Sequence, residues 1–294
     1  MIYRIVHKTL YEYADAVNLS HNLVRARPRN HSAQTCRWHE LVVSPVPAIR
    51  GERRDYFGNH VSWLSLQEPH TLLTIESRSE VEVRLELRPG LSQGASWEQV
   101  AATIARSAAP ETIAVRQFTF DSLYGRRLPE LAAYALGSFS ADRPLLECAF
   151  DLTRRIHADF KYLPGSTKVG TPSLEVLRIR KGVCQDFAHL AIGCLRSLGL
   201  AARYVSGYLV TTPPPGRPRL TGADASHAWI SVFTPDFGWV DFDPTNGVMP
   251  LDSHITVAWG RDYDDVGPIR GILIGGQRQR LDVSVDVVPI ENAN

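Results

Sequence analysis

The sequence contains few cysteines, and their spacing excludes common structural roles. Its 294 residues include only Cys36, Cys148, Cys184 and Cys194. No Cys-x-x-Cys pair of the kind that holds structural zinc is present. The first residues show neither the apolar stretch nor the cleavage site of a secretion signal. We therefore expect four free thiols and a location in the cytoplasm.

Charge and long apolar runs are also limited. Lys+Arg total 32 and Asp+Glu total 31, which gives a net charge of +1. A dedicated nucleic-acid binder usually has a basic excess. No run approaches the roughly 18 apolar residues of a membrane span. The expected partners therefore include neither nucleic acid nor membrane, and the oligomeric state is left open.

Motifs for several other chemistries are missing. The segment 165–168 lacks Walker spacing, no Gly-x-Ser-x-Gly sequence occurs, and the acidic run at 262–265 lacks the calcium-loop pattern of an EF-hand. Cys184, His189 and Cys194 fall on one predicted helix but point in three directions, so one ion could not collect them. We expect no metal and no cofactor.

The hydrophobic pattern divides the chain into three segments and predicts an α+β fold. Residues 1–92 are expected to form a β-rich N-terminal domain, with the clearest strand at 80–87. Residues 93–158 are expected to form a helical connecting segment, which begins with a capping box at Ser96 and Gln99. Residues 159–294 are expected to form the third unit, a core with a C-terminal strand. Whether residues 1–90 fold independently, share a core with the helical segment or pair with that strand is left open.

Within the last two segments, the elements alternate in type. Helices are expected at 144–158 and 184–197, where Gly199 ends the second. The pattern predicts strands at 202–209, 227–233, 239–242 and 281–287, and an irregular loop at 211–223, which is rich in proline.

Three residues at the ends of these elements suggest nucleophilic catalysis. Cys184 begins a helix, and a helix N-terminus favours the negative charge of a thiolate. His227 begins a strand and could accept the thiol proton. Asp243 ends a strand and could orient the imidazole of His227. Together the three side chains have the chemistry of a cysteine acyl-transfer site.

The hairpin at 227–242 predicts that two of them meet. If Phe233 pairs with Trp239, then Trp229 lies opposite Asp243, and His227 is the diagonal neighbour of Asp243 on the same face. A slip of one residue would separate them.

Each residue also has an ordinary explanation on its own. A cysteine on an apolar helix is most often part of the core, a histidine at a strand end is usually a surface residue, and an aspartate before proline often belongs to a turn. The combination in this order is what favours catalysis.

Four segments carry a resemblance to a known family. They are Gly182–Leu190, Leu198–Tyr208, Asp224–Trp229 and Gly238–Gly247, and they resemble the nucleophile helix, the following strand, the histidine motif and the aspartate motif of the transglutaminase-like superfamily. Segments 7–13, 55–59 and 260–266 are similar to the other parts of one bacterial branch.

The resemblance implies a papain-like core in which a nucleophile helix packs on an antiparallel sheet. It places the family triad on Cys184, His227 and Asp243, acting on amide bonds without a cofactor. Members include protein crosslinkers, peptidases and amidases, and the bacterial branch has no settled substrate.

A thiol acyl transferase also needs donors for the oxyanion. The backbone N–H of Cys184 is one candidate. Crosslinking members use a tryptophan upstream of the cysteine, and none lies between Trp97 and Cys184. Tyr162 is therefore the candidate for the second donor, and Gln185 is the reserve.

Other residues near the predicted triad are candidates for the walls of a substrate cleft. Tyr208, Ser226 and Trp229 are candidate substrate-binding residues, and the loop 211–225 is a candidate wall. The expected substrate is a peptide or protein that carries a carboxamide or amide bond.

The sequence is consistent with three functions for the protein. We expect a thioester intermediate that is resolved by water, as in a peptidase or amidase, because water needs no second docking site. The alternatives are a crosslinking transglutaminase and a catalytically silent binding or scaffold protein. The β-rich N-terminal segment could also recognise a partner.

Overall fold

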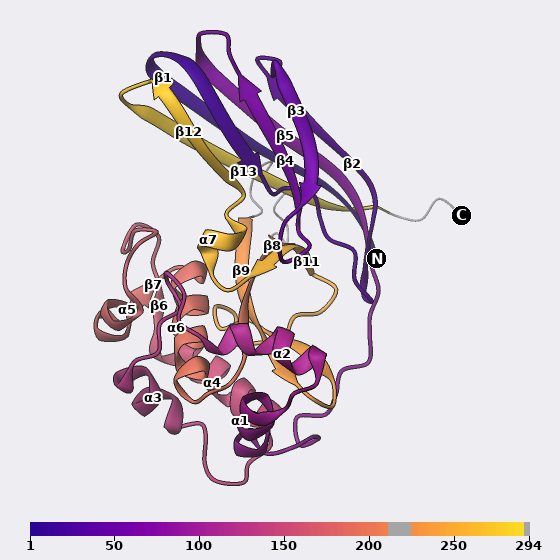
Figure 1. Cartoon of the computed structure of the whole chain (residues 1–294), viewed down its shortest axis with the longest axis vertical. Helices are drawn as coiled ribbons and strands as arrows, with labels where there is room; N and C mark the ends of the chain where they lie inside the picture. The colour runs from indigo at the N-terminus through magenta and orange to yellow at the C-terminus, as the bar shows by residue number, and fades with distance from the viewer. Residues whose placement is uncertain (211–224, 291–294) are drawn as a thin grey trace, which may run out of the picture.

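A computed structural model describes residues 1–210 and 225–290 of the chain. It is built from two units, a large N-terminal sheet and a mixed core of helices around a smaller sheet (Figure 1). The predicted loop at 211–223 lies outside the described residues. The α+β fold with a β-rich N-terminal sheet is confirmed.

The N-terminal sheet has seven antiparallel strands in the order β2-β5-β1-β4-β3, and β12 and β13 both pair with β1. These strands are β1 (Ile2–Val24), β2 (Gln34–Ser44), β3 (Ile49–Arg54), β4 (His60–Leu66), β5 (His70–Val83), β12 (Ile269–Gly275) and β13 (Gln279–Ile290).

The strand β1 organises this sheet, because it is 23 residues long and has partners along both edges. Its first half pairs with β5 and β13, and its second half pairs with β4 and β12. The sequence assigned residues 159–294 to the core. The structure instead places the two last strands of that segment in the N-terminal sheet.

The strand predicted at 80–87 is shifted in the structure. Strand β5 begins at His70 and ends at Val83, where its pairing with β2 also ends. Leu85 and Leu87 are 72% and 103% exposed. The alternation of apolar residues in the sequence therefore extends beyond Val83, where β5 loses its partner strand.

Helices fill the connecting segment and one side of the core. They are α1 (Trp97–Arg106), α2 (Pro110–Arg116), the 3-10 turn Gln117–Thr119, α3 (Pro129–Leu136), α4 (Leu145–Asp159), α5 (Ser173–Ile179), α6 (Cys184–Ser197) and α7 (Tyr263–Val266). The Ser96–Gln99 capping box is present at the start of α1, and the helices predicted at 144–158 and 184–197 are confirmed within one residue.

The core sheet has the order β10-β9-β8-β11. Its strands are β8 (Ala202–Leu209), β9 (Ala225–Thr234), β10 (Gly238–Phe242) and β11 (His254–Gly260), and a short parallel pair is formed by β6 (Lys161–Tyr162) and β7 (Lys181–Gly182). Helix α6 packs against β8 and β9, and Phe187, Leu190 and Ala191 are among its fully buried residues. Burial of this apolar face fixes the start of α6 beside the sheet.

Two amide side chains join the units at the edge strand β11. Gln34 donates to the carbonyl of Thr256 and accepts from its N–H, both at 2.8 Å. Asn59 does the same for Trp259, at 2.9 and 3.0 Å. Each amide replaces the missing neighbour strand and satisfies backbone groups that would otherwise be buried without partners.

Within the described ranges, no helix has both the length and the apolar character needed to cross a bilayer.

Candidate active site

Cys184 is the first residue of α6 and is partly exposed. The preceding turn is held by Asp186, whose carboxylate accepts from the backbone N–H of Val183 at 2.8 Å and from the hydroxyl of Thr167 at 2.6 Å. A Cβ at Gly182 would approach the side chain of Asp186 to 2.9 Å. A glycine at this position therefore lets Asp186 fold back and cap the helix that presents the thiol.

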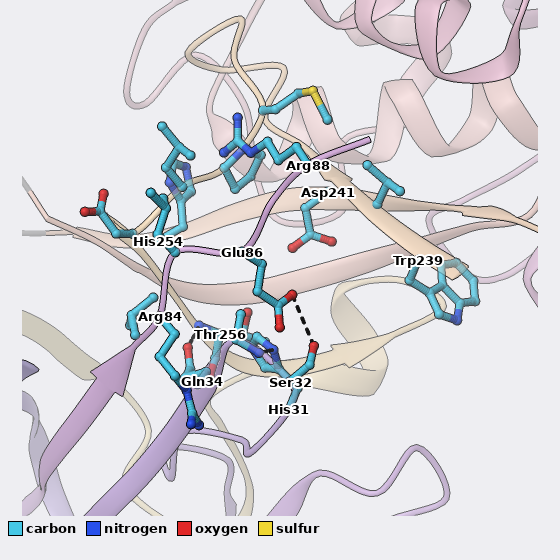
Figure 2. Close-up of a pocket in the computed structure, with 18 of the residues that line it drawn as sticks. His31, Ser32, Gln34, Arg84, Glu86, Arg88, Trp239, Asp241, His254 and Thr256 are labelled. Carbon is cyan, nitrogen blue, oxygen red and sulfur yellow. Dashed lines mark hydrogen bonds between the residues drawn. The ribbon is translucent and has the colours of Figure 1, made fainter. Parts of the chain in front are cut away.

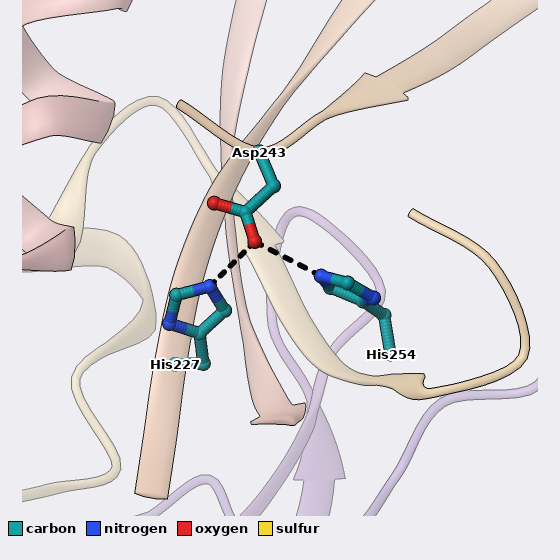
Figure 3. A group of neighbouring side chains, drawn as sticks. All are labelled: His227, Asp243 and His254. Carbon is teal, nitrogen blue, oxygen red and sulfur yellow. Dashed lines mark hydrogen bonds and ion pairs between the residues drawn. The ribbon is translucent and has the colours of Figure 1, made fainter. Parts of the chain in front are cut away.

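The histidine and the aspartate come from the hairpin of β9 and β10. Phe233 pairs with Trp239 and Ser231 pairs with Asp241, which is the register that the sequence predicted. Asp243 follows β10 directly and reaches back to His227 near the start of β9. The two side chains meet at 2.8 Å, between Nε2 of His227 and Oδ2 of Asp243 (Figure 3).

This contact fixes the role of each imidazole nitrogen of His227. An ionised carboxylate can only accept hydrogen bonds, so Nε2 must carry the proton. Burial by itself lowers the pKa of His227, but hydrogen bonds to Asp243 and Cys184 and the charges of both raise it to about 10. The structure therefore favours an imidazolium beside the thiol, which is the state that supports a thiolate nucleophile.

Asp243 is fully buried and accepts a dense set of hydrogen bonds. Its Oδ2 accepts from His227, from His254 at 3.0 Å and from the Asn246 side chain at 2.7 Å. Its Oδ1 accepts from the backbone N–H groups of Thr245 and Asn246. Burial raises the pKa of Asp243, but hydrogen bonds to His227, His254 and Asn246 outweigh it, so the pKa lies well below its usual range.

His254 is the residue that sequence reasoning missed. It begins β11, the edge strand farthest from β10, and its Nε2 points at the same oxygen of Asp243 that His227 contacts (Figure 3). The order of strands in the sheet brings His254 and Asp243 together. No short motif in the sequence encodes that order.

The indole of Trp229 packs against the rings of both histidines. It meets the ring of His254 edge to face at a centroid distance of 5.2 Å and lies 6.1 Å from that of His227. Its Nε1 donates to Asp241 at 2.9 Å. A Cβ at Gly207 would come within 2.5 Å of this indole. The absence of a side chain at Gly207 thus lets Trp229 cross β8 and reach β11.

His227, Asp243 and His254 could also act as a metal-binding group. One ligand atom from each lies within 4.8 Å of the others, and all three residues are buried. Their contacts are hydrogen bonds in which each imidazole Nε2 carries a proton, and a metal would have to displace both protons. The absence of a metal stays a prediction.

The two candidate oxyanion donors have different surroundings. Tyr162 pairs with Gly182 in the short parallel ladder and is 49% exposed. Burial and the charge of Cys184 raise the pKa of Tyr162. Gln185 instead donates its side-chain amide to the carbonyl of Val169 at 3.1 Å.

The structure separates the three candidate substrate-binding residues. Ser226 is exposed beside His227. Trp229 is fully buried beneath the histidines. Tyr208 is 2% exposed, and its hydroxyl is 2.9 Å from Nδ1 of His7. Tyr208 therefore lies in the contact between the core and the N-terminal sheet. The remaining candidate wall at 211–224 lies outside the described residues.

All four cysteines are free thiols, as predicted. Cys148 and Cys194 are buried, and burial raises their pKa values to about 11 and about 12. Burial also raises the pKa of Cys36. These three thiols serve as internal references for the reactivity of Cys184.

Two family models match the chain on either side of the helical segment. Residues 3–82 match the bacterial transglutaminase-like N-terminal region, and residues 133–244 match the transglutaminase-like superfamily. The second match contains Cys184, His227 and Asp243 and ends just after the last of them.

Relatives extend this similarity over nearly the whole chain. An uncharacterized protein of Mycobacterium tuberculosis is 45% identical over 98% of this chain and 93% of its own length. An uncharacterized protein of Mycobacterium leprae is 35% identical over 97% of both chains. The chain belongs to the transglutaminase-like superfamily and carries the N-terminal region of its bacterial branch.

A solved structure and a named enzyme are also similar. The structure is from Cytophaga hutchinsonii, is described as a "putative cysteine protease", and matches with a TM-score of 0.75 at 20% identity over 99% of this chain and 92% of that one. It confirms the fold. A protein-glutamine gamma-glutamyltransferase of Pseudomonas aeruginosa is 31% identical over 34% of this chain and 15% of its own length.

Proposed function

We propose that the protein is a cysteine-dependent acyl-transfer enzyme that acts on peptide or carboxamide bonds through Cys184, His227 and Asp243. The observation that carries the proposal is the 2.8 Å contact from Nε2 of His227 to Asp243, which leaves Nδ1 for the thiol. The effect of Cys184 on His227, which raises the pKa of the imidazole, and the start of α6 at the thiol support it further.

The first half of the reaction forms a thioester. The Cys184 thiolate attacks the substrate carbonyl, and the backbone N–H of Cys184 with Tyr162 stabilises the oxyanion. Gln185 is the less favoured second donor, because its amide already donates to Val169. The tetrahedral intermediate then collapses, the C–N bond breaks, and His227 gives its Nδ1 proton to the departing amine.

The second half resolves the thioester. His227, now neutral at Nδ1, takes a proton from the incoming nucleophile and returns it to the Cys184 thiolate or holds it as the imidazolium. With water, the product is a carboxylic acid. With an amine, the product is a new amide. We favour water, because it needs no second docking site.

Two alternatives remain open to test. The similarity to a glutamyltransferase of Pseudomonas aeruginosa supports transamidation, with an amine as the acceptor. A silent binding or scaffold protein would keep the fold without a reactive thiol. For the compartment, we propose the cytoplasm, because four unpaired thiols suit a reducing environment.

The decisive test is the rate at which iodoacetamide alkylates each cysteine between pH 4 and 10, followed by peptide mapping. We expect Cys184 to react through a fast phase at low pH, and His227→Ala to abolish that phase. Cys36 is the matched control, because it is partly exposed and has no imidazole partner among the described residues. A profile for Cys184 like that of Cys36, and insensitive to His227, would exclude the acyl-transfer proposal.

The acceptor is decided in a second assay. Glutamine-containing peptides are incubated with the protein, with and without a primary amine, and the products are read by mass spectrometry. Acid products in both incubations support hydrolysis. Amine adducts that displace the acid products would instead establish transamidation, and the Cys184→Ala variant should form neither.

A further inference from the structure

A cavity lies on the same face of the core sheet as the histidines, beyond His254. Its volume is about 430 Å³, and it is bounded by that face and by the segment 83–89, which leaves the N-terminal sheet (Figure 2). Neither Cys184 nor His227 lines it. It has the size of a small-molecule pocket and is separate from the reacting thiol.

Arg203 is the first sign that this cavity binds a ligand. The side chain projects from β8 and is only 9% exposed. Its guanidinium lies between two indoles, at 3.8 Å from the ring centroid of Trp259 and 4.4 Å from that of Trp239. Its Nε is buried and has no hydrogen-bond partner within residues 1–210 and 225–290. A buried donor without a hydrogen-bond partner destabilises the folded protein. A ligand that supplies an acceptor for this nitrogen would remove that cost.

His31 gives an independent second sign. Its Nε2 is also buried and unpaired in the described part of the chain, and the residue lines the same cavity. Burial lowers the pKa of His31, the charge of Asp241 raises it, and that of Arg203 lowers it again, so these three groups lie within electrostatic reach of one another. Two residues with an unpaired buried nitrogen therefore line the same cavity.

Carboxylates share this space with the guanidinium groups. Asp241 is held in place by Trp229, and Glu86 accepts from the hydroxyl of Ser32 at 3.3 Å. Figure 2 shows both carboxylates turned toward the middle of the cavity, with Arg88 on one side and His31 on the other. Asp241 also acts electrostatically on Arg203 and Arg88.

This mixture of charges selects the kind of ligand. The lining contains Arg84, Arg88 and Arg203 together with Glu86, Asp241 and Asp252. A polyanion such as phosphate would meet as many carboxylates as guanidinium groups. A molecule with one anionic and one cationic end would instead satisfy both. The tryptophans and the apolar residues Leu85 and Leu251, which also line the cavity, suit an apolar body between those ends.

We propose that this cavity binds a zwitterionic amino acid or dipeptide with an apolar side chain. The ligand carboxylate contacts Arg203 and Arg88, the ammonium group contacts Asp241 and Glu86, and the side chain packs against the tryptophans. The site does not depend on the proposed catalytic function. It borders the triad, because His254 lines the cavity and also contacts Asp243.

The test is isothermal titration of the full chain with four probes of different charge. They are phenylalanine, N-acetylphenylalanine, phenylalaninamide and inorganic phosphate. We expect phenylalanine to bind at least about tenfold more tightly than each singly charged analogue and than phosphate. The same titration on the Cys184→Ala variant should give the same affinity, which separates this cavity from the thiol site.

Variants locate the binding. Arg203→Gln should weaken phenylalanine binding at least about tenfold, and Arg88→Gln and Glu86→Gln, at exposed positions that do not threaten folding, should each weaken it several-fold. Arg106→Gln, an exposed change on α1, is the matched control and should have no effect. Equal binding of N-acetylphenylalanine or phosphate, unchanged affinity in the Arg88 and Glu86 variants, or no saturable binding at millimolar ligand would each overturn the proposal.

Discussion

His254 and His227 donate to the same oxygen of Asp243, at 3.0 and 2.8 Å. The carboxylate is therefore fixed from two sides, by a strand at the far edge of the sheet and by the strand that carries the candidate general base. We infer that His254 is a positioning residue, because its contact is with Asp243 and the candidate base is His227.

Removing this second donor should change the behaviour of Asp243. The hydrogen bond from His254 lowers the pKa of Asp243, so His254→Phe should raise that pKa. The acid limb of the Cys184 alkylation profile should then move to higher pH, and the rate should fall. His254→Gln keeps an N–H donor and should restore much of the wild-type profile. If both variants lower stability alike and leave the acid limb in place, His254 has only a packing role.

The stability of the fold should depend on pH through His227 and Asp243. The pKa of His227 is raised from 6.5 to about 10 in the folded state. Its contribution is therefore fully present below pH 6.5 and is lost as the pH rises through about 10. The pKa of Asp243 is lowered, so its contribution is present above the unfolded value near 3.8 and is lost as the pH falls below it.

Urea unfolding of wild type and His227→Gln checks this sign. The difference in unfolding free energy between the two should be largest between about pH 4 and 6.5 and should shrink toward pH 10. A difference that grows with rising pH would contradict the assigned direction of the His227 shift.

Asn59 should be essential for the stability of the core edge. Asn59→Ala leaves the buried N–H and carbonyl of Trp259 without the partners that it supplied. Each unsatisfied buried group costs about 1–3 kcal/mol, so the free energy of unfolding should fall by about 2 kcal/mol or more. Gln67→Ala removes an exposed amide and should change stability by less than about 0.5 kcal/mol. Equal effects in a denaturant titration would argue against the bridging role.

Gly207 should not tolerate a side chain. A Cβ there would overlap the indole of Trp229 and the carbonyl of Ile255, so Gly207→Ala should cost about 1–3 kcal/mol and displace Trp229 from both histidines. Gly170→Ala is the matched control, because a Cβ at Gly170 meets nothing within 4 Å. Thermal unfolding and Cys184 alkylation are measured on both. A Gly207 variant as stable and as reactive as the control would show that the strands can shift to accommodate it.

The sequence predicted local features of the site well. The register of the β9–β10 hairpin depends on alternating residues and a five-residue turn, so the meeting of His227 and Asp243 could be worked out from adjacent segments. The start of α6 at Cys184 was equally local, because Gly182 and Gly199 bracket it.

What the sequence did not predict depends on strands that are far apart along the chain. His254 reaches Asp243 only because β11 lies beside β8. The partner of β13 is β1, almost the whole chain away. Tyr208 was a candidate substrate-binding residue, yet its hydroxyl meets His7 across the contact between the units. Tertiary contacts of this kind leave no local periodic signal.

The pairing of the last strand with the first has a consequence for synthesis of the protein. Residues 2–13 of β1 pair with residues 279–290 of β13 along their full length. The mixed core is therefore an insertion within a sheet whose first strand is synthesised long before its last. The seventh strand of the N-terminal sheet can therefore pair only after the whole of the core has been synthesised.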